Sequence, residues 1–178
     1  MRKRICVDMD EVVADTIAKH MARYNRDHDT HITRADLTGK WLRDVVSADH
    51  HEVLEAYLRE EGFFEDLAVM PEAPRVLQAL QPHFEIFIAS AAMEVPTSFN
   101  SKYRWLARHF PFIPPSHIVF CGDKSILRAD YLVDDNPRQL RRFQGTGLLY
   151  SSPHNLLVTE FRRVDTWLDV EKFFFGVA

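Results

Sequence analysis

The chain is poor in cysteine, in charge of one sign and in long apolar stretches. Only two of its 178 residues are cysteines, so no disulfide framework is expected, and Cys6 and Cys121 are interpreted as small buried residues. The formal net charge is −4 with acids and bases mixed, which disfavours binding to a nucleic-acid polymer. No run approaches the roughly 18 apolar residues of a transmembrane helix.

The basic start of the chain has the character of a secretion signal for only four residues. Asp8, Asp10 and Glu11 follow soon after, where a signal peptide needs an uninterrupted apolar segment. We therefore expect a cytoplasmic protein without membrane association. The composition, 46% apolar and 27% charged, is typical of a folded globular domain, with room for a modest insert.

Short apolar runs alternate with amphipathic stretches along most of the chain. Near-continuous apolar runs of this length are typical of strands buried on both faces of a parallel sheet. The runs cover 4–7, 84–89, 117–121, 131–133 and, more weakly, 147–150. Helical spacing predicts helices over 71–81, 98–110, 137–145 and 166–175. This alternation predicts an α/β fold with a doubly wound parallel sheet.

One segment interrupts the alternation. More than seventy residues separate the first two apolar runs, although a crossover needs only one helix. Residues 14–70 are polar and have helical periodicity, with Ile17, Met21 and Tyr24 on one face and Gly62 closing a later helix. We expect no strand there. The interpretation is a helical cap domain over 14–70, inserted into a core domain of 1–13 and 71–178.

Reactive side chains follow four of the apolar runs. Because ligands of an open α/β sheet bind beyond the carboxyl ends of its strands, these side chains should meet at one edge. They are Asp8 and Asp10, then Ser90, then Lys124, then Asp134 and Asp135. Clustered carboxylates repel one another unless a cation joins them, and an oxygen-rich site suits Mg²⁺. The set matches phosphoryl transfer, with a carboxylate able to act as the nucleophile.

These motifs resemble those of the haloacid dehalogenase (HAD) superfamily of phosphatases. The first motif is similar to residues 8–12, the second to Ser90, the third to Lys124 and the fourth to Asp134-Asp135. Further similarity to the 5′(3′)-deoxyribonucleotidases lies in 62–65, 87–90, 102–106, 123–137 and 154–155. The resemblance implies a Rossmann-like HAD core with a small helical cap inserted after the first strand.

The resemblance also implies roles for the residues at the motif positions. Asp8 would be the nucleophile, and Asp10 the general acid and then the general base. Mg²⁺ would be held by Asp8, the backbone carbonyl of Asp10 and Asp135, with Asp134 beside them. Ser90 and Lys124 would hold the phosphate.

A nucleobase pocket in the cap is a further implication of the resemblance. Trp41 and Tyr57 fall where the family has aromatic residues, although both could instead form the core of the cap. Thr16 and Lys40 stand where the best-known members carry Phe. Ala91 replaces a hydroxyl residue, and Gly122 stands where Arg is expected. The pocket should therefore be more polar than is usual in the family.

Three functions follow from these features. The leading hypothesis is a Mg²⁺-dependent phosphatase of nucleoside monophosphates, 5′(3′)-deoxyribonucleotides in particular, acting through an aspartyl-phosphate. The second keeps the chemistry but takes a sugar phosphate or another small polar monoester. The third is a non-catalytic phospho-acceptor module. Because dimers occur in the resembled family, a homodimer is also a candidate state. Base, sugar and phosphate position stay open.

Overall fold

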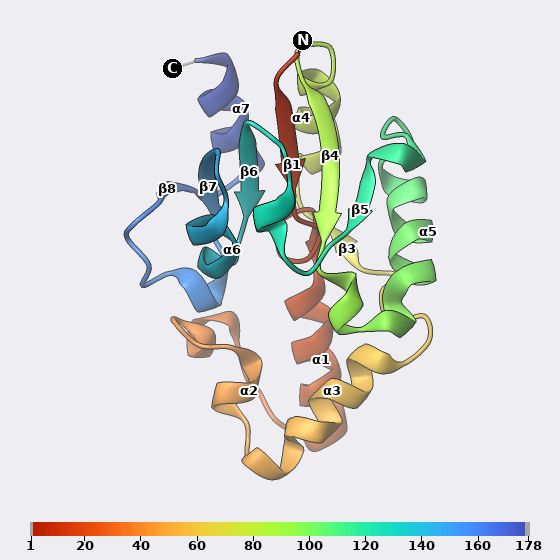
Figure 1. Cartoon of the computed structure of the whole chain (residues 1–178). Coiled ribbons are helices and arrows are strands. Elements are labelled where there is room, and N and C mark those ends of the chain that lie inside the picture. Colours follow the sequence, from red (N-terminus) through yellow and green to blue (C-terminus); the bar gives the residue numbers. More distant parts are fainter. Residues whose placement is uncertain (1, 177–178) are drawn as a thin grey trace.

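A computed structural model describes residues 2–176 and contains a six-stranded parallel sheet in the order β5-β4-β1-β6-β7-β8 (Figure 1). The strands are β1 Arg4–Val7, β4 Glu85–Ser90, β5 Ile118–Phe120, β6 Tyr131–Asp134, β7 Thr146–Tyr150 and β8 Arg162–Val164. The central strand β1 pairs with β4 and β6, so that Cys6 faces Phe87 on one side and Leu132 on the other. The predicted doubly wound α/β fold is confirmed.

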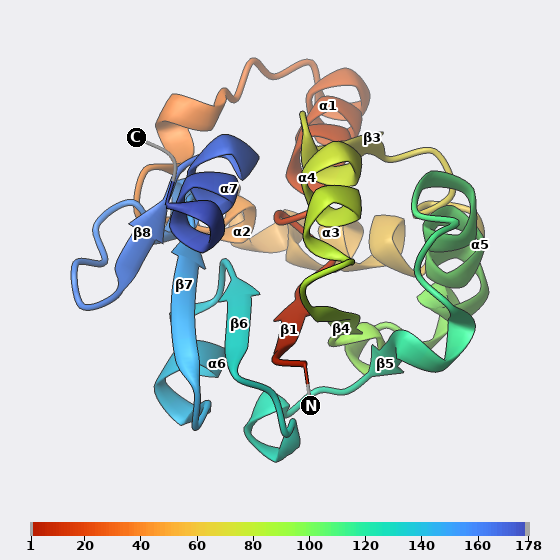
Figure 2. The same ribbon diagram turned by 90° about the horizontal axis from the view of Figure 1, so that it is seen from above.

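Helices cover both faces of this sheet (Figure 2). The helices α4 Ala73–Leu80 and α7 Trp167–Phe175 pack together on one face, α5 Phe99–His109 lies beside the β5 edge, and α6 Pro137–Arg142 covers the other face. Local sequence explains where two of them begin. The side chain of Asn136 accepts from the Arg138 N–H at 3.0 Å ahead of α6, and Thr166 forms a capping box ahead of α7.

The predicted helical insert lies beyond the carboxyl ends of the strands (Figure 1). It contains α1 Thr16–His28, α2 Leu42–Val45 and α3 His51–Arg59. Short 3-10 helices complete the chain: η1 Arg34–Leu37, η2 Ala48–His50, η3 Ala92–Glu94, η4 Pro96–Ser98, η5 Pro115–His117, η6 Lys124–Ile126 and η7 Pro153–Asn155. Within residues 2–176, the helices fall short of the length and apolar character that a membrane crossing requires.

Three details of the sequence interpretation are wrong. Residues 14–70 do contain strands, because β2 Ala14–Asp15 pairs antiparallel with β3 Ala68–Val69 at the two ends of the insert. Two-residue strands are too short to show an alternating pattern. The edge strand β8 was also missed, because its Arg-Arg-Val sequence is half polar and lacks an apolar run. In addition, α3 ends at Arg59, three residues before Gly62.

His20 packs α1 against α3 inside the insert. Its Nε2 donates to the Leu54 carbonyl at 3.0 Å, and its ring meets Tyr57 and Phe63 edge-on. Burial lowers the pKa of His20 from 6.5 to about 4, so the folded protein holds the neutral ring. Because the folded-state pKa lies below the ordinary value, stability is full above about pH 6.5 and falls as the pH drops towards 4.

We therefore predict that His20→Gln flattens the pH dependence of stability between pH 7 and pH 4. The wild-type free energy of unfolding should fall by up to about 3 kcal/mol more than that of the variant over this window. Urea unfolding at several pH values measures this difference. His31→Gln is the control, because His31 is exposed. Equal slopes for wild type and H20Q would contradict the assignment.

Candidate active site

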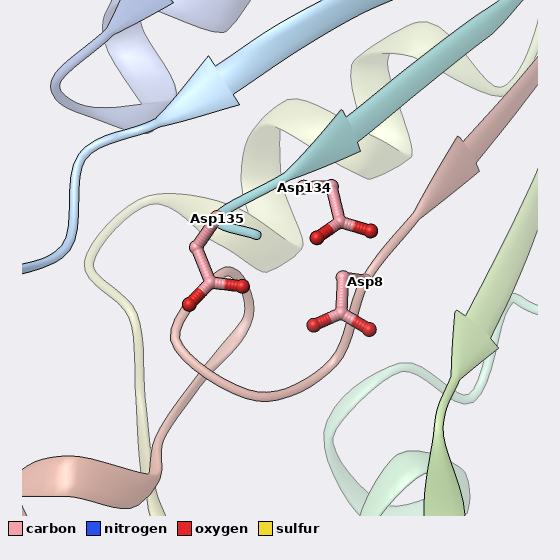
Figure 3. Close-up of side chains that lie close together, drawn as sticks. All are labelled: Asp8, Asp134 and Asp135. Carbon is pink, nitrogen blue, oxygen red and sulfur yellow. The ribbon is translucent and has the colours of Figure 1, made fainter. Parts of the chain in front are cut away.

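Three carboxylates meet at the carboxyl edge of the two central strands (Figure 3). Asp8 directly follows β1, and its backbone N–H donates to the Val133 carbonyl at 2.9 Å, which extends the ladder to β6. Asp134 ends β6, and Asp135 comes next. One carboxylate oxygen from each of the three acids lies within 4.8 Å of the others, and all three side chains are buried. The predicted convergence of these strand ends is confirmed.

Lys124 supplies a positive charge inside this cluster. It begins η6 after β5 and is 1% exposed, and its Nζ donates to Asp8 Oδ1 at 2.5 Å and to Asp134 Oδ2 at 2.6 Å. Burial opposes the charge, but Asp134 and Asp8 raise the pKa of Lys124 above its ordinary value. One ammonium therefore stands against three carboxylates, which leaves an excess of negative charge.

The remaining oxygens of the cluster fit a divalent cation. Both oxygens of Asp134 are engaged, Oδ2 by Lys124 and Oδ1 by the Asn136 N–H at 2.8 Å. Burial raises the pKa of Asp8 to about 7 and that of Asp135 well above its ordinary value, and the neighbouring acids add to both shifts. Buried, uncompensated carboxylate oxygens are the ligands that Mg²⁺ takes. Asp8 and Asp135 are thus the better placed ligands.

Asp10 lies on the cavity side of this cluster and is held by two donors. The Thr16 hydroxyl donates to Asp10 Oδ1 at 2.7 Å, and Lys102 forms an ion pair with Oδ2. Burial by itself would raise the pKa of Asp10, but the charge of Lys102 lowers it below the ordinary value. The two contacts fix both oxygens of the carboxylate, so its orientation is set before any substrate arrives.

Lys102 is a site residue that the sequence interpretation missed. It lies on α5, is 4% exposed, and its Nζ also donates to Ser90 Oγ at 3.2 Å and lies 4.5 Å from the Phe64 ring centroid. A single lysine on an amphipathic helix normally extends into solvent. The one available signal was its position in the segment 102–106, which resembles the deoxyribonucleotidases.

The carboxylates open into a cavity of about 380 Å³ between the sheet edge and the insert. Its far wall is largely apolar and is formed by Ile17, Leu42, Leu54, Leu58, Phe64 and Val95. Of the sequence-predicted residues, Asp8, Asp10, Lys124, Asp134, Asp135, Thr16, Trp41 and Ala91 line it. Ser90 is fully buried beside Lys102 and is not part of the lining. Its contact with phosphate stays a prediction.

The structure separates the four residues predicted for the base pocket. Thr16 and Trp41 line the cavity, whereas Lys40 is exposed outside it. Tyr57 is buried within the insert, where the Arg23 guanidinium lies 4.3 Å from its ring centroid. Tyr57 therefore occupies the position of a core residue of the insert, and the aromatic wall of the cavity is small.

The fold matches a known structural class. A HAD family hydrolase from Deinococcus radiodurans R1, solved with bound phosphate and sodium, superposes with a TM-score of 0.64 at 14% identity, covering 98% of this chain and 96% of that one. At this identity the likeness shows the fold alone. The molecule has the HAD fold, as the sequence motifs predict.

Sequence relatives define the family. The family model "5' nucleotidase, deoxy (Pyrimidine), cytosolic type C protein" matches residues 2–178. A "Putative 5'(3')-deoxyribonucleotidase" from Staphylococcus aureus (strain Mu50) is 47% identical over 173 residues, covering 97% of this chain and 96% of the relative. The 5'(3')-deoxyribonucleotidase of Bacillus subtilis (strain 168) is 31% identical over 172 residues, covering 97% and 98%. The chain therefore belongs to this nucleotidase family and is a phosphatase, so the phospho-acceptor module is excluded.

Removal of the Lys124 ammonium should destabilise the folded protein. We predict that Lys124→Met lowers the free energy of unfolding by about 3–5 kcal/mol, because it leaves buried carboxylates without their counter-charge. Urea unfolding at neutral pH without divalent cations measures the loss. Lys172→Met is the control, because Lys172 is exposed, and it should change stability by no more than about 0.5 kcal/mol. A K124M variant as stable as this control would show that Lys124 does not balance the cluster.

Proposed function

We propose that the protein hydrolyses deoxyribonucleoside monophosphates in a Mg²⁺-dependent reaction that passes through an aspartyl-phosphate on Asp8. The observation that supports this most directly is the pairing of Asp8 with the Lys124 ammonium at 2.5 Å at the floor of the cavity. This contact holds one oxygen of Asp8 and leaves the other free. Membership of the nucleotidase family supports the substrate class.

In the first step, the free oxygen of Asp8 attacks the phosphorus atom, and the bond from phosphorus to the ester oxygen breaks. Asp10 gives a proton to the departing alcohol oxygen. Lys102 favours the ionised form of Asp10, but the negative charge of a bound phosphate favours the protonated form that this step needs. Lys124 offsets charge on the phosphoryl oxygens.

In the second step, a water molecule attacks the phosphorus of the aspartyl-phosphate. Asp10, now ionised, takes a proton from this water, and the bond between phosphorus and Asp8 breaks to release phosphate. Lys102 and Thr16 keep Asp10 oriented for both transfers. A bound Mg²⁺, held by Asp8, the Asp10 carbonyl and Asp135, would add positive charge opposite the phosphate.

The far part of the cavity suits the nucleoside. Its apolar wall can bury a sugar and a planar base, and the volume lies within the usual range for small-molecule pockets. Of the three cations that line the cavity, Lys102 and Lys124 are paired with carboxylates. The contact of Arg43 is instead the Nδ1 atom of His51 at 3.4 Å, which leaves its other donors available for a base carbonyl.

We also propose that residues 14–70 act as a cap domain that closes over the substrate. The two-stranded β2–β3 pair joins both ends of this segment, and the segment supplies most of the apolar wall of the cavity. Closure would exclude water from the aspartyl-phosphate until the alcohol has left. Cytoplasmic location and a homodimer stay predictions from sequence.

A substrate panel tests the proposed function. In the presence of Mg²⁺, we expect kcat/KM for deoxyribonucleoside monophosphates to exceed that for sugar phosphates and glycerol phosphate by at least about tenfold. The reason is that only a nucleotide has a base that can cover the apolar wall of the cavity. Phosphate release is the measurement. A chelator should abolish turnover. If sugar phosphates are hydrolysed faster than every nucleotide, the second of the sequence-based hypotheses replaces this one.

Substitution of the nucleophile tests the covalent step. We predict that Asp8→Asn lowers kcat by at least about 10³-fold, because an amide cannot form the phosphoryl bond. Asp165→Asn is the control. Asp165 is an exposed acid that accepts a hydrogen bond from the Ser151 hydroxyl, and it does not line the cavity. Acid-quenched mass spectrometry should detect phosphate on Asp8 in the wild type. Retention of activity by D8N would exclude an aspartyl-phosphate at this position.

A further inference from the structure

A stacked pair of rings joins the insert to the core beside the carboxylates. The indole of Trp41, in the loop between η1 and α2, lies parallel to the imidazole of His154 in η7, with ring centroids 3.7 Å apart and an interplanar angle of 14°. The His154 side chain is 4% exposed. Trp41 also lines the cavity, so the stack lies next to it.

A backbone contact next to the stack ties the same two loops together. The Gly39 N–H donates to the Pro153 carbonyl at 2.9 Å. Gly39 has a φ of +71°, and a Cβ there would lie 2.5 Å from Leu157 Cδ1. The positive φ favours glycine at this position, whereas the exposed side chain of Leu157 could move aside. We call this set of contacts, made by Gly39, Trp41, Pro153, His154 and Leu157, the seam.

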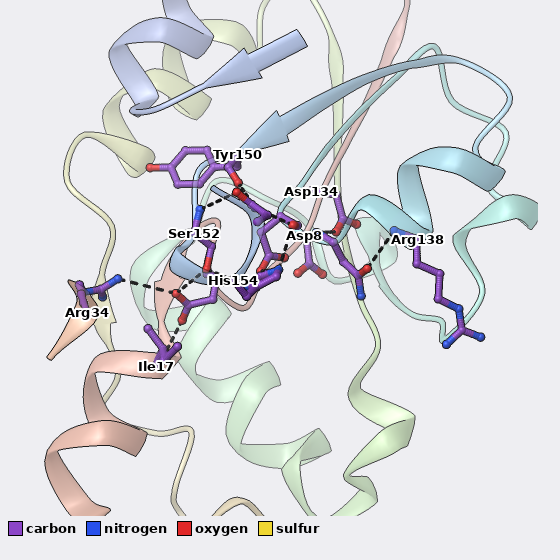
Figure 4. A network of polar contacts seen from close by, with 12 residues as sticks. Asp8, Ile17, Arg34, Asp134, Arg138, Tyr150, Ser152 and His154 are labelled. Atoms are coloured by element: carbon purple, nitrogen blue, oxygen red, sulfur yellow. Dashed lines mark hydrogen bonds and ion pairs between the residues drawn. The ribbon is translucent and has the colours of Figure 1, made fainter. Parts of the chain in front are cut away.

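The other edge of His154 faces the backbone of a proposed cation ligand. Its Nε2 donates to the Asp135 carbonyl at 3.2 Å, and the same carbonyl accepts from Asn155 Nδ2 at 2.7 Å. The Ser152 hydroxyl lies 3.1 Å from His154 Nδ1 and completes the set (Figure 4). With Nε2 as donor in a neutral ring, Nδ1 is an acceptor, and the Ser152 hydroxyl can donate either to it or to Glu11 Oε2 at 3.4 Å.

His154 therefore contacts both sides of the cavity at once. One face of its ring carries Trp41 from the insert, and one edge holds the main chain of Asp135 in the core. If the insert moved away, the ring would lose its stacking partner and gain water, which competes for the Nε2 donor. The Asp135 backbone would then be held by Asn155 with less support.

We propose that His154 is a positioning residue that couples closure of the seam to cation binding at Asp135. The inference rests on the proposed cation site. Coupling between two equilibria is reciprocal. If the Trp41–His154 stack raises the affinity for the cation by some factor, the bound cation stabilises the stack by the same factor. The substrate cavity would then close more readily over a loaded site than over an empty one.

The test compares Mg²⁺ affinity and Trp41 fluorescence in the absence of substrate. The variants are Trp41→Leu, which removes the stack, His154→Phe, which keeps a stacking ring without the donor, and His154→Gln, which keeps a donor without the ring. The dissociation constant comes from the rise in Tm with Mg²⁺ concentration. The indole of Trp41 is 46% exposed, whereas Trp105 and Trp167 are fully buried, so Trp41 is the reporter.

We expect each of the three variants to bind Mg²⁺ about two- to tenfold more weakly than the wild type, the range that one aromatic pair provides. The double variant W41L/H154Q should be no weaker than either single one, because both remove the same link. Mg²⁺ should change the Trp emission of the wild type but not that of H154F. His83→Gln is the control, because His83 also packs on an aromatic ring, that of Phe175, and lies outside the seam.

Two results separate the inference from the proposed function. If all three variants bind Mg²⁺ as tightly as the wild type, His154 does not couple the seam to Asp135. The same conclusion follows if the losses of affinity in W41L and H154Q add in the double variant. If the wild type itself shows no shift in Tm with Mg²⁺, the proposed cation site fails. A variant that unfolds is identified by circular dichroism, and the remaining variants still decide the outcome.

Discussion

The site depends on how the protein balances charge at the carboxyl ends of β1 and β6. Three buried carboxylates there would repel one another strongly without compensation, and Lys124 offsets only part of their charge. This imbalance supports the proposed roles of Asp8 and Asp135, because it leaves carboxylate oxygens that Lys124 does not contact. A second lysine would reduce the excess of negative charge and so weaken the attraction for a cation.

A second charge pair lines the same cavity. Lys102 and Thr16 fix the carboxylate of Asp10, which is the more accessible of the acids that line the cavity floor. Lys124 thus pairs with Asp8 and Asp134, and Lys102 pairs with Asp10, the acid that we propose as the general acid and base. The two lysines come from different elements: Lys124 from η6, which packs against α6, and Lys102 from α5.

The sequence predicts the sheet and the carboxylate cluster because a parallel strand has a direction. Each apolar run identifies a buried strand, and the first reactive residue after it must lie at the common edge, which places Asp8, Lys124 and Asp135 correctly. Positions set by packing are different. Lys102 and Tyr57 both lie on amphipathic helices, and helical spacing gives the face but not its neighbour. One proves to face the site and the other the interior of the insert. The strands β2, β3 and β8 lack any apolar pattern.

The position of the insert explains why its contacts with the core matter. The chain leaves β1 just before Asp8, forms the insert, and returns through β3, so the segment that carries Asp8 also leads into one end of the insert. If the β2–β3 pair were the only connection, the part of the insert around Trp41 could move away from the core. The seam lies in this part, where Trp41 meets His154 beside Asp135. The two ends of the insert are therefore joined by the β2–β3 pair, and its middle contacts the core through the seam.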